Sequence, residues 1–342
     1  MIVTNPTLFV ADIGGTKSDL ALFKTSDLRT PIYTQRFINT QYSGVEEIVT
    51  QFMATVGSTP AVACFAVAGV VRANTAQMTN LPWKLSGEQL KARFGFTTAL
   101  IINDLTAVAS CLRYLDKENP SEVFSILKGV PEDGAVSGVI APGTGLGQGF
   151  VVDFSGKTFV TGSEGGHTDF APVDDEQMAL LSWMLNVQKP VSYESIIAGP
   201  GIARLYDFCK VYHEMGESQD VIDEMAGQAD RTPAIIQGVT RENQCPLCLK
   251  VTQLFLRILG SEAGNLALKV YAKGGIYVGG GILPRLVGHI SFDGFRENFL
   301  NKGLMSELMA TIPVMVLLNK DAALTGAAGY LVEFLSENGK EL

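Results

Sequence analysis

Short apolar segments separated by tight turns open the chain, and they predict β-strands. Residues 8–13 form an apolar run that ends at a Gly-Gly-Thr turn, and in residues 18–24 Leu20 and Leu22 occupy alternate positions. Two such segments on either side of a glycine turn are typical of a β-hairpin. The segment 32–38 predicts a third strand.

Apolar residues three or four positions apart predict a helix between residues 44 and 57. The same comparison of spacings predicts further elements up to residue 115, namely strands at 61–69 and 97–103 and helices at 88–95 and 105–115. The stretch from residue 70 to Trp83 has little regularity, so no element is predicted there.

The strand–glycine turn–strand pattern occurs again at residues 136–154, after a charged segment at 116–133 that is a candidate domain boundary. The later pattern predicts helices at 174–186, 201–216, 247–271 and 323–337, a weakly patterned helical region at 219–240, and strands at 158–162, 274–282 and 311–319. Two related α/β lobes that face each other would produce this repetition.

Length and charge narrow the class of protein. The chain has 342 residues, which at roughly 150 residues per domain suggests about two domains. Hydrophobic residues make up 46% and charged residues 18%, values that exclude a disordered chain. The net charge is −9 and no Lys/Arg cluster offsets it, so we expect neither a nucleic-acid partner nor a membrane surface.

The sequence signals for a signal peptide and for a membrane-spanning helix are also weak. The first 15 residues lack a basic region and Asp12 interrupts their apolar stretch, so we expect no signal peptide. The uncharged run between Glu47 and Arg72 has the length of a membrane span, but Gly57 and Pro60 divide it into a helix end and a strand.

The five cysteines include a Cys-x-x-Cys pair, Cys245 and Cys248. A zinc site would need a second pair or a suitably spaced histidine, and none of the three histidines, His167, His213 and His289, has that spacing. We therefore expect no zinc, helix-terminal cysteines without special chemistry, and reduced thiols in the cytosol.

The glycine turn at Asp12–Thr16 offers the first candidate site. Backbone amides at Gly14 and Gly15 can approach an anion closely, Thr16 adds a hydroxyl, and Asp12 could hold Mg²⁺ directly or through water. A strand follows this turn, which excludes the P-loop and the dinucleotide fingerprint because both require a helix there. An ordinary hairpin turn is the alternative.

A second turn, residues 141–149, has four glycines at alternating positions between two apolar strands, with Thr144 placed as Thr16 is in the first turn. Glycines weaken a sheet unless the backbone must bend around a ligand. Two matched hairpins could therefore bind a polyphosphate from both sides. A third glycine cluster, at 274–282, could support a base or ribose, or only allow close packing of a strand and a helix.

Polar residues at the ends of predicted strands are candidates for chemistry. Asp104 follows Asn103 at the end of a buried strand, where a carboxylate can take a proton from a hydroxyl, although both residues are also good helix caps. Glu164 and His167, separated by two glycines, can hydrogen-bond vicinal sugar hydroxyls. Glu194 offers a further carboxylate or a solvated charge.

Together these segments resemble the bacterial glucokinases of the zinc-free, non-ROK type, within the hexokinase/actin/Hsp70 superfamily of ATP-binding folds. The matching segments, in the family's order, are ADIGGTKSDLALF, LIINDLTAVA, APGTGLGQGF, SEGGHTDFAP, ESIIAGPGIARLY, GGIYVGGGILPR and ALTGAAGYL. The sequence departs mildly from the family at Pro142, and the region 226–244 resembles it least.

The resemblance implies ATP- and Mg²⁺-dependent phosphorylation of the 6-hydroxyl of D-glucose, a step that feeds glycolysis. By position, Asp104 matches the general base. The residues that match the family's sugar-binding set are Asn103, Asp104, Glu164, His167 and Glu194. Those that match its nucleotide-binding set are Asp12, Gly14, Gly15, Thr16, Gly143, Thr144, Gly145, Gly279, Gly280 and Gly281, with Asp12 also as the Mg²⁺ ligand.

The resemblance also implies an α/β fold of two RNase H-like, actin-like ATPase lobes with the active site in the cleft between them. The small lobe would comprise residues 1–115 plus about 320–342, and the large lobe 116–319. A cytoplasmic homodimer is expected. The alternatives are a kinase for another hexose or an N-acetylhexosamine, a non-catalytic sugar sensor, and an actin- or chaperone-like ATPase.

Overall fold

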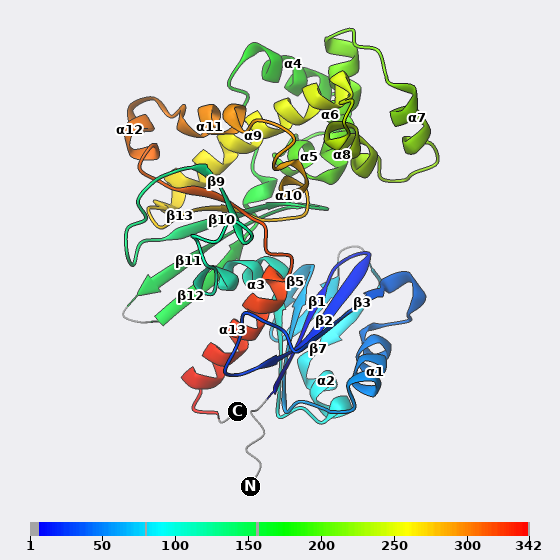
Figure 1. Cartoon of the computed structure of the whole chain (residues 1–342), viewed down its shortest axis with the longest axis vertical. Coiled ribbons are helices and arrows are strands. Elements are labelled where there is room, and N and C mark those ends of the chain that lie inside the picture. Colours follow the sequence, from blue (N-terminus) through cyan, green and yellow to red (C-terminus); the bar gives the residue numbers. More distant parts are fainter. Residues whose placement is uncertain (1–6, 79–80, 155–156, 341–342) are drawn as a thin grey trace. The chain divides into compact units, whose positions relative to one another are not determined.

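The computed structural model describes residues 7–78, 81–154 and 157–340, and these form mixed β-sheets flanked by helices (Figure 1). The chain divides into two compact units. The first unit consists of Met1–Asn119, Val160–Gly162 and Asn319–Leu342, and the second of Pro120–Phe159 and Ser163–Leu318. The α/β fold class predicted from the sequence is confirmed.

A five-stranded sheet forms the centre of the first unit, in the order β3-β2-β1-β4-β8. Its strands are β1 (Thr7–Ile13), β2 (Lys17–Lys24), β3 (Tyr33–Ile38), β4 (Val62–Val67) and β8 (Thr98–Asn103). β1 and β2 pair as the predicted antiparallel hairpin, whereas β1, β4 and β8 are parallel. Their carboxyl ends therefore lie along one edge of the sheet.

Both faces of this sheet are buried, because alternate residues of β1 point to different cores. Phe9 and Ala11 pack against α1 (Val45–Val56) and α2 (Gly87–Phe94). Leu8 and Val10 pack with residues of α3 (Asp104–Ser110) and of α13 (Ala322–Glu337). Figure 1 shows α13, in red, and α1 on opposite sides of this sheet. Short 3-10 turns, η1 (Asn39–Gln41) and η2 (Cys111–Arg113), complete the unit.

A three-stranded sheet occupies the stretch for which the sequence predicts no element. It comprises β5 (Gly69–Arg72), β6 (Thr75–Met78) and β7 (Lys84–Ser86). The β5–β6 turn uses Ala73 and Asn74, both with positive φ and neither a glycine, so the usual turn signal is missing. Asn74 also donates to the Ala99 carbonyl and accepts from the Ile101 amide, which fixes this turn on β8.

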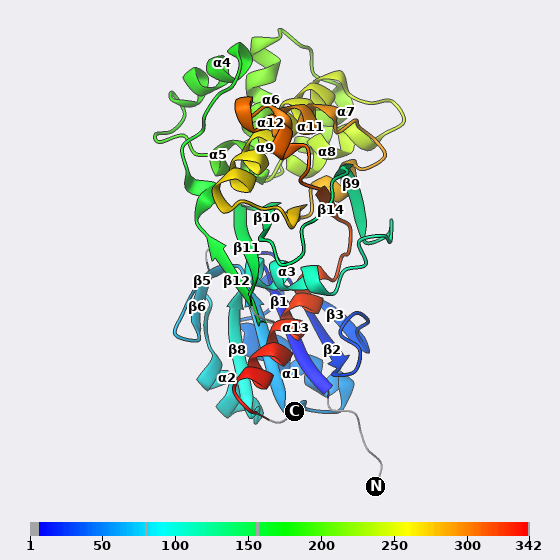
Figure 2. The same cartoon turned by 90° about the vertical axis from the view of Figure 1, so that its left-hand side faces the viewer.

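The second unit contains a six-stranded mixed sheet in the order β12-β11-β10-β13-β14-β9 (Figure 2). Its strands are β9 (Val123–Leu127), β10 (Ser137–Pro142), β11 (Leu146–Phe154), β12 (Lys157–Ser163), β13 (Gly275–Val278) and β14 (Val314–Leu317). The second hairpin predicted from the sequence is β10–β11, paired antiparallel. The prediction missed β9, which lies within the charged segment that was interpreted as a boundary.

The helices of this unit share one large core with the sheet. They are α4 (Asp175–Met184), α5 (Glu194–Ile197), α6 (Gly199–Tyr212), α7 (Gln219–Met225), α8 (Thr232–Thr240), α9 (Pro246–Val270), α10 (Leu283–Leu286), α11 (Asp293–Leu300) and α12 (Ser306–Met309), with the 3-10 turns η3 (Gly165–His167) and η4 (Gly303–Met305). The long helix α9 has buried residues along its whole length. It is therefore the main internal support of the unit.

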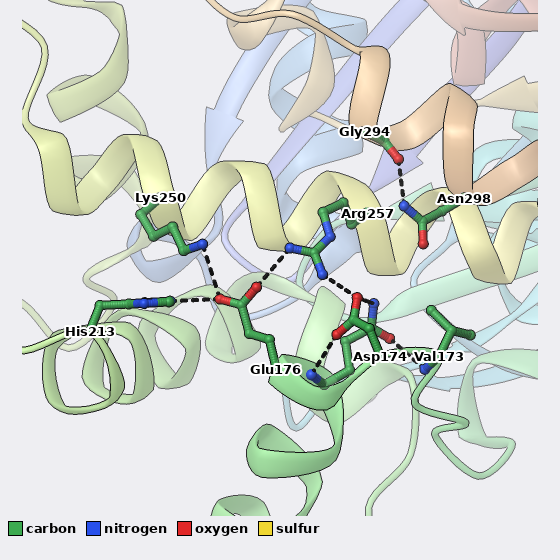
Figure 3. A network of polar contacts seen from close by, with 9 residues as sticks. Val173, Asp174, Glu176, His213, Lys250, Arg257, Gly294 and Asn298 are labelled. Carbon is green, nitrogen blue, oxygen red and sulfur yellow. Dashed lines mark hydrogen bonds and ion pairs between the residues drawn. The ribbon is translucent and has the colours of Figure 1, made fainter.

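A polar cluster joins α9 to α4 and to the end of α6, as Figure 3 shows. Glu176 accepts hydrogen bonds from His213 at 2.6 Å and from Arg257 at 2.7 Å, and Lys250 lies 3.2 Å from it. Arg257 also binds Asp174, the residue that caps α4. Partial burial of Glu176 opposes ionisation, but the three basic partners together lower the pKa of its carboxyl below the usual 4.5.

We predict that Glu176→Gln lowers the melting temperature at pH 7 and has a much smaller effect near pH 3. Because the folded-state pKa is lowered, the contribution of Glu176 is present above about 4.5 and is lost as the pH falls through the folded value. Thermal unfolding followed by circular dichroism at both pH values measures the difference, with Glu242→Gln, an exposed residue, as the control. Equal losses at both pH values would contradict the assigned ion pairs.

Candidate active site

Asn39, a buried residue, clamps the first glycine turn. Its side-chain amide donates to the Gly14 carbonyl at 2.8 Å, and its backbone amide donates to the Thr16 carbonyl at 2.9 Å. The hydroxyl of Ser18 in turn donates to the Asn39 carbonyl oxygen at 2.7 Å. The sequence did not single out Asn39, because an asparagine after a strand is an ordinary turn residue.

The clamp leaves part of the turn backbone available for a ligand. The Gly14 amide donates across the turn to the Lys17 carbonyl at 3.0 Å. Within the described residues, the amides of Gly15 and Thr16 donate to no protein acceptor. Thr16 is exposed, so its hydroxyl and these two amides form a small set of hydrogen-bond donors that suits phosphate oxygens.

Two carboxylates lie at the carboxyl ends of the parallel strands β1 and β8, which flank β4 in the sheet. Asp12 is near the end of β1, and Asp104 follows the last residue of β8. Burial, then the charges of Asp104 and Asp19, raise the pKa of Asp12 to about 7, although Lys17 and Arg36 oppose this. Burial also raises the pKa of Asp104, against hydrogen bonds that include one from the Leu105 amide.

Asn103 is the N-cap residue of α3. At this position the sequence left a helix cap open as the alternative to a functional role. Its side-chain oxygen accepts from the Leu105 amide at 2.9 Å, and its amide nitrogen donates to the Gly69 carbonyl at 3.1 Å. The same Leu105 amide lies 2.9 Å from an oxygen of Asp104. The cap therefore fixes the orientation of both residues, and one N–H of Asn103 remains for a ligand.

The second glycine turn is held by a residue predicted for the sugar site. Glu194 accepts from the Leu146 amide at 2.9 Å through Oε2, directly beyond the turn at Gly143–Gly145. The Gly143 carbonyl accepts from the Gly199 amide at 2.7 Å, at the first residue of α6. Thr144 lies at the exposed tip of this turn. Glu194 is thus fixed by the second glycine turn and is not a freely solvated charge.

Glu164 and His167 lie beside Glu194. His167 Nδ1 is 3.7 Å from Glu194 Oε1, and His167 Nε2 is 3.9 Å from Glu164 Oε2. The side chains of His167 and Glu164 are 61% and 82% exposed, so they have little packing of their own and depend on their backbone for position. Their exposed oxygen and nitrogen atoms suit a polyhydroxy ligand.

The two glycines between Glu164 and His167 permit a close approach to β11. A Cβ atom at Gly166 would lie 2.2 Å from the Leu146 carbonyl oxygen, and one at Gly165 would lie 2.2 Å from the side-chain oxygen of Gln148. The loop therefore rests directly on the strand that begins at the second glycine turn. The Gly-Gly pair has a steric cause that its position in the sequence did not reveal.

The third glycine cluster adjoins the same turn. The Gly279 amide donates to the Ile140 carbonyl at 2.8 Å. Gly280 has a φ of +84°, and a Cβ atom there would lie 2.2 Å from the Pro142 carbonyl oxygen. Gly281 has open space around it. The predicted nucleotide residues of the second unit are consequently neighbours, as are Asp12, Asp104 and the first turn in the first unit.

Other candidate chemistry is limited in the part of the chain that the structure describes. No group of three or more His, Cys, Asp or Glu residues could hold a metal ion there. Cys245 and Cys248 are buried and unbridged at the start of α9. None of the helices in the described ranges is long and apolar enough to cross a membrane.

The fold and these residues define a class: an actin-like ATPase fold with paired strand–turn–strand units and carboxylates at strand ends, as in sugar kinases. The family model named Glucokinase matches residues 9–334. A glucokinase of Nostoc punctiforme is 37% identical over 337 residues, covering 94% of this chain and 97% of the relative. The chain belongs to the glucokinase family, and the predicted class of ATP-dependent hexose kinase is confirmed.

Solved structures agree. The structure of a glucokinase from an Antarctic psychrotroph is 32% identical, with a TM-score of 0.80, and the match covers 95% of this chain and 98% of that one. A ROK-family glucokinase from Streptomyces griseus, solved with glucose and AMPPNP, matches with a TM-score of 0.69 over 96% of this chain and 99% of that one. At 18% identity this second likeness establishes the fold alone.

We predict that Asp12→Asn raises the melting temperature at pH 8, in the absence of ligands. A carboxyl whose pKa rises from 3.8 to about 7 on folding costs stability as the pH increases through that interval, and an amide has no such cost. Calorimetry at pH 8 and pH 5 measures the gain, which should shrink at pH 5. Glu242→Gln, which changes an exposed residue of the second unit, is the control and should leave the melting temperature unchanged at both pH values. A less stable Asp12→Asn protein at pH 8 would contradict the raised pKa.

Proposed function

We propose that this protein is a glucokinase that transfers the γ-phosphoryl group of ATP to the 6-hydroxyl of D-glucose. The observation that carries the proposal is the carboxylate of Asp104, oriented by the α3 cap and placed at the same strand edge as Asp12. Membership of the glucokinase family supports the choice of glucose and ATP.

Asp104 is the proposed general base. One of its oxygens accepts from the Leu105 amide, which leaves the other to accept the proton of the sugar hydroxyl. As that O–H bond breaks, the sugar oxygen bonds to the γ-phosphorus and the bond to the β-phosphate oxygen breaks, releasing ADP. A carboxylate with a raised pKa is a better proton acceptor than an exposed one.

The phosphates are proposed to bind at the glycine turns. In the first unit the donors are the amides of Gly15 and Thr16, next to Gly14, and in the second they come from the turn Gly143–Gly145, which includes Thr144. The glycines Gly279–Gly281, packed on Pro142, are proposed to face the adenosine. Donors already held by Asn39 and Glu194 need little rearrangement when charge develops, which favours catalysis.

Asp12 is the proposed Mg²⁺ ligand, directly or through water. The site fits a hard cation: the donor is a carboxylate oxygen, and its raised pKa reflects burial and a neighbouring negative charge that a cation would offset. Bound Mg²⁺ supplies positive charge to the phosphate oxygens during transfer. Since no three-residue metal cluster exists among the described residues, the remaining ligands would be phosphate oxygens and water.

The sugar hydroxyls are proposed to bind Asn103 and Asp104 in the first unit and Glu164, His167 and Glu194 in the second. His167 lies within 4 Å of both glutamates, so donors and acceptors alternate over a distance suited to adjacent hydroxyls. Glu194 uses Oε2 for the Leu146 amide and keeps Oε1 on the His167 side.

The organisation of the whole protein is also a proposal. We infer a small lobe of residues 1–115 plus about 320–342 and a large lobe of 116–319, which the division into Met1–Asn119 with Asn319–Leu342 and a second unit supports. A homodimer in the cytoplasm, where ATP is available, is proposed on the family resemblance. Light scattering of the purified protein tests the dimer.

We predict glucose-dependent release of ADP by the purified protein in the presence of Mg²⁺, and a loss of about 100-fold or more in kcat for Asp104→Asn because proton transfer is removed. A coupled ADP assay over glucose, mannose, fructose and N-acetylglucosamine measures both. Glu242→Gln, which removes an exposed carboxylate outside the proposed site, is the control. Release of ADP that is indifferent to sugar would instead support an ATPase, and a different preferred sugar would identify another hexose kinase.

A further inference from the structure

A buried carboxylate of α9 lies beneath the proposed sugar site and takes no part in the mechanism above. Glu262 is fully buried, in a helix whose other inward residues are almost all apolar. Its Oε1 accepts from the side-chain amide of Gln148 at 2.7 Å, and its Oε2 accepts from that of Asn265 at 3.0 Å. Burying a carboxylate is costly, and well-packed apolar residues often give a more stable core. Its directional hydrogen bonds therefore call for a reason other than stability.

One of these hydrogen bonds leads to the loop of Glu164 and His167. Gln148 is 2% exposed on β11, and its side-chain oxygen is the atom that a Cβ at Gly165 would meet at 2.2 Å. The amide nitrogen held by Glu262 fixes which way this side chain points. The Gln148–Glu262 hydrogen bond consequently fixes the part of β11 against which the loop of Glu164 and His167 packs.

The other hydrogen bond leads to Glu194. Asn265 donates from the same amide nitrogen to the hydroxyl of Tyr193 at 3.1 Å, and Tyr193 directly precedes Glu194. The Tyr193 amide donates to the Thr168 carbonyl at 3.0 Å, next to His167. The hydrogen-bonded chain from Glu262 thus reaches the sugar-binding loop from two sides.

Lys302 completes the group and supplies an opposite charge. Its ammonium donates to the Asn265 side-chain oxygen at 2.8 Å and to the Ser261 carbonyl at 2.9 Å. Because Lys302 occupies the oxygen of Asn265, the nitrogen must face Glu262 and Tyr193. Burial lowers the pKa of Lys302, and the nearby Glu262 opposes that shift.

We propose that Gln148, Glu262 and Asn265 are positioning residues that set the places of Glu164, His167 and Glu194 for binding glucose. This inference rests on the proposed function. Hydroxyl recognition requires donors and acceptors held to within about 0.5 Å, which rigid supporting hydrogen bonds provide. The two most exposed members, Glu164 and His167, cannot obtain that precision from their own packing.

The test exchanges the partners of one hydrogen bond. Gln148→Glu places two carboxylates together, so we expect KM for glucose to rise about tenfold or more. Adding Glu262→Gln restores a donor–acceptor pair with reversed roles, since Gln at 262 can donate to Glu at 148 and still accept from Asn265. We expect the double variant to return to within about threefold of the wild-type KM for glucose, with KM for ATP little changed throughout.

The control separates positioning from general destabilisation. Glu176→Gln disturbs a different carboxylate that is also bound by α9, through Arg257, and should lower the melting temperature without changing KM for glucose (Figure 3). If Gln148→Glu does not fold, Gln148→Met removes the hydrogen bond without adding charge and should raise KM for glucose in the same direction.

Three results would overturn the inference while leaving the proposed function intact: an unchanged KM for glucose in a folded Gln148→Glu or Gln148→Met protein, a double variant as impaired as the single one, or a rise in KM for glucose in Glu176→Gln equal to that of the Gln148 variants. A wild-type protein that does not phosphorylate glucose would instead refute the proposed function itself.

Discussion

The parallel pairing of β1, β4 and β8 is the constraint on which the chemistry of the first unit depends. Parallel strands end together, so residues far apart in the chain, Asp12 and Asp104, reach one edge of the sheet and interact through their charges. A shift of β1 by one residue relative to β4 would turn Asp12 toward the opposite face of the sheet. Burial is the main cause of the raised pKa of both carboxyls, and the charge of Asp104 adds to the shift at Asp12.

In the second unit the side chain of Glu194 contacts two features that are far apart in the sequence, the second glycine turn and His167. Glu194 secures the second glycine turn through the Leu146 amide and, through its other oxygen, lies beside His167. A change at Glu194 would therefore disturb the second glycine turn and the position of His167 together. The matched hairpins share their glycine chemistry, but Asn39 clamps the first and Glu194 the second. The two turns are therefore similar in sequence, but different residues hold them in place.

How far the sequence predicts the structure depends on whether the signal is local. The two hairpins, the long helices and the strand before Asn103 have clear periodicity, and all of them form. The β5–β7 sheet was missed because Ala73 and Asn74 form its turn without glycine. The network around Glu262 could not be predicted, since Gln148 is 114 residues away and each residue alone appears as an ordinary core or strand position. The roles of the predicted site residues and the lobe boundaries stay predictions.

Both units bury carboxylates, and this burial lowers the stability of the fold compared with apolar packing at the same positions. Asp12 and Asp104 repel each other at a strand edge, and Glu262 is buried in the helix that supports its unit. The pairs around Glu176 differ, because Lys250, Arg257 and His213 lower the pKa of that carboxyl and stabilise its charge. Selection for stability alone would favour clusters such as the one around Glu176, in which basic side chains pair with the carboxylate. It would disfavour buried carboxylates such as those of Asp12, Asp104 and Glu262. Buried carboxylates beside the first glycine turn and beneath the proposed sugar loop therefore mark where we expect function to constrain this fold.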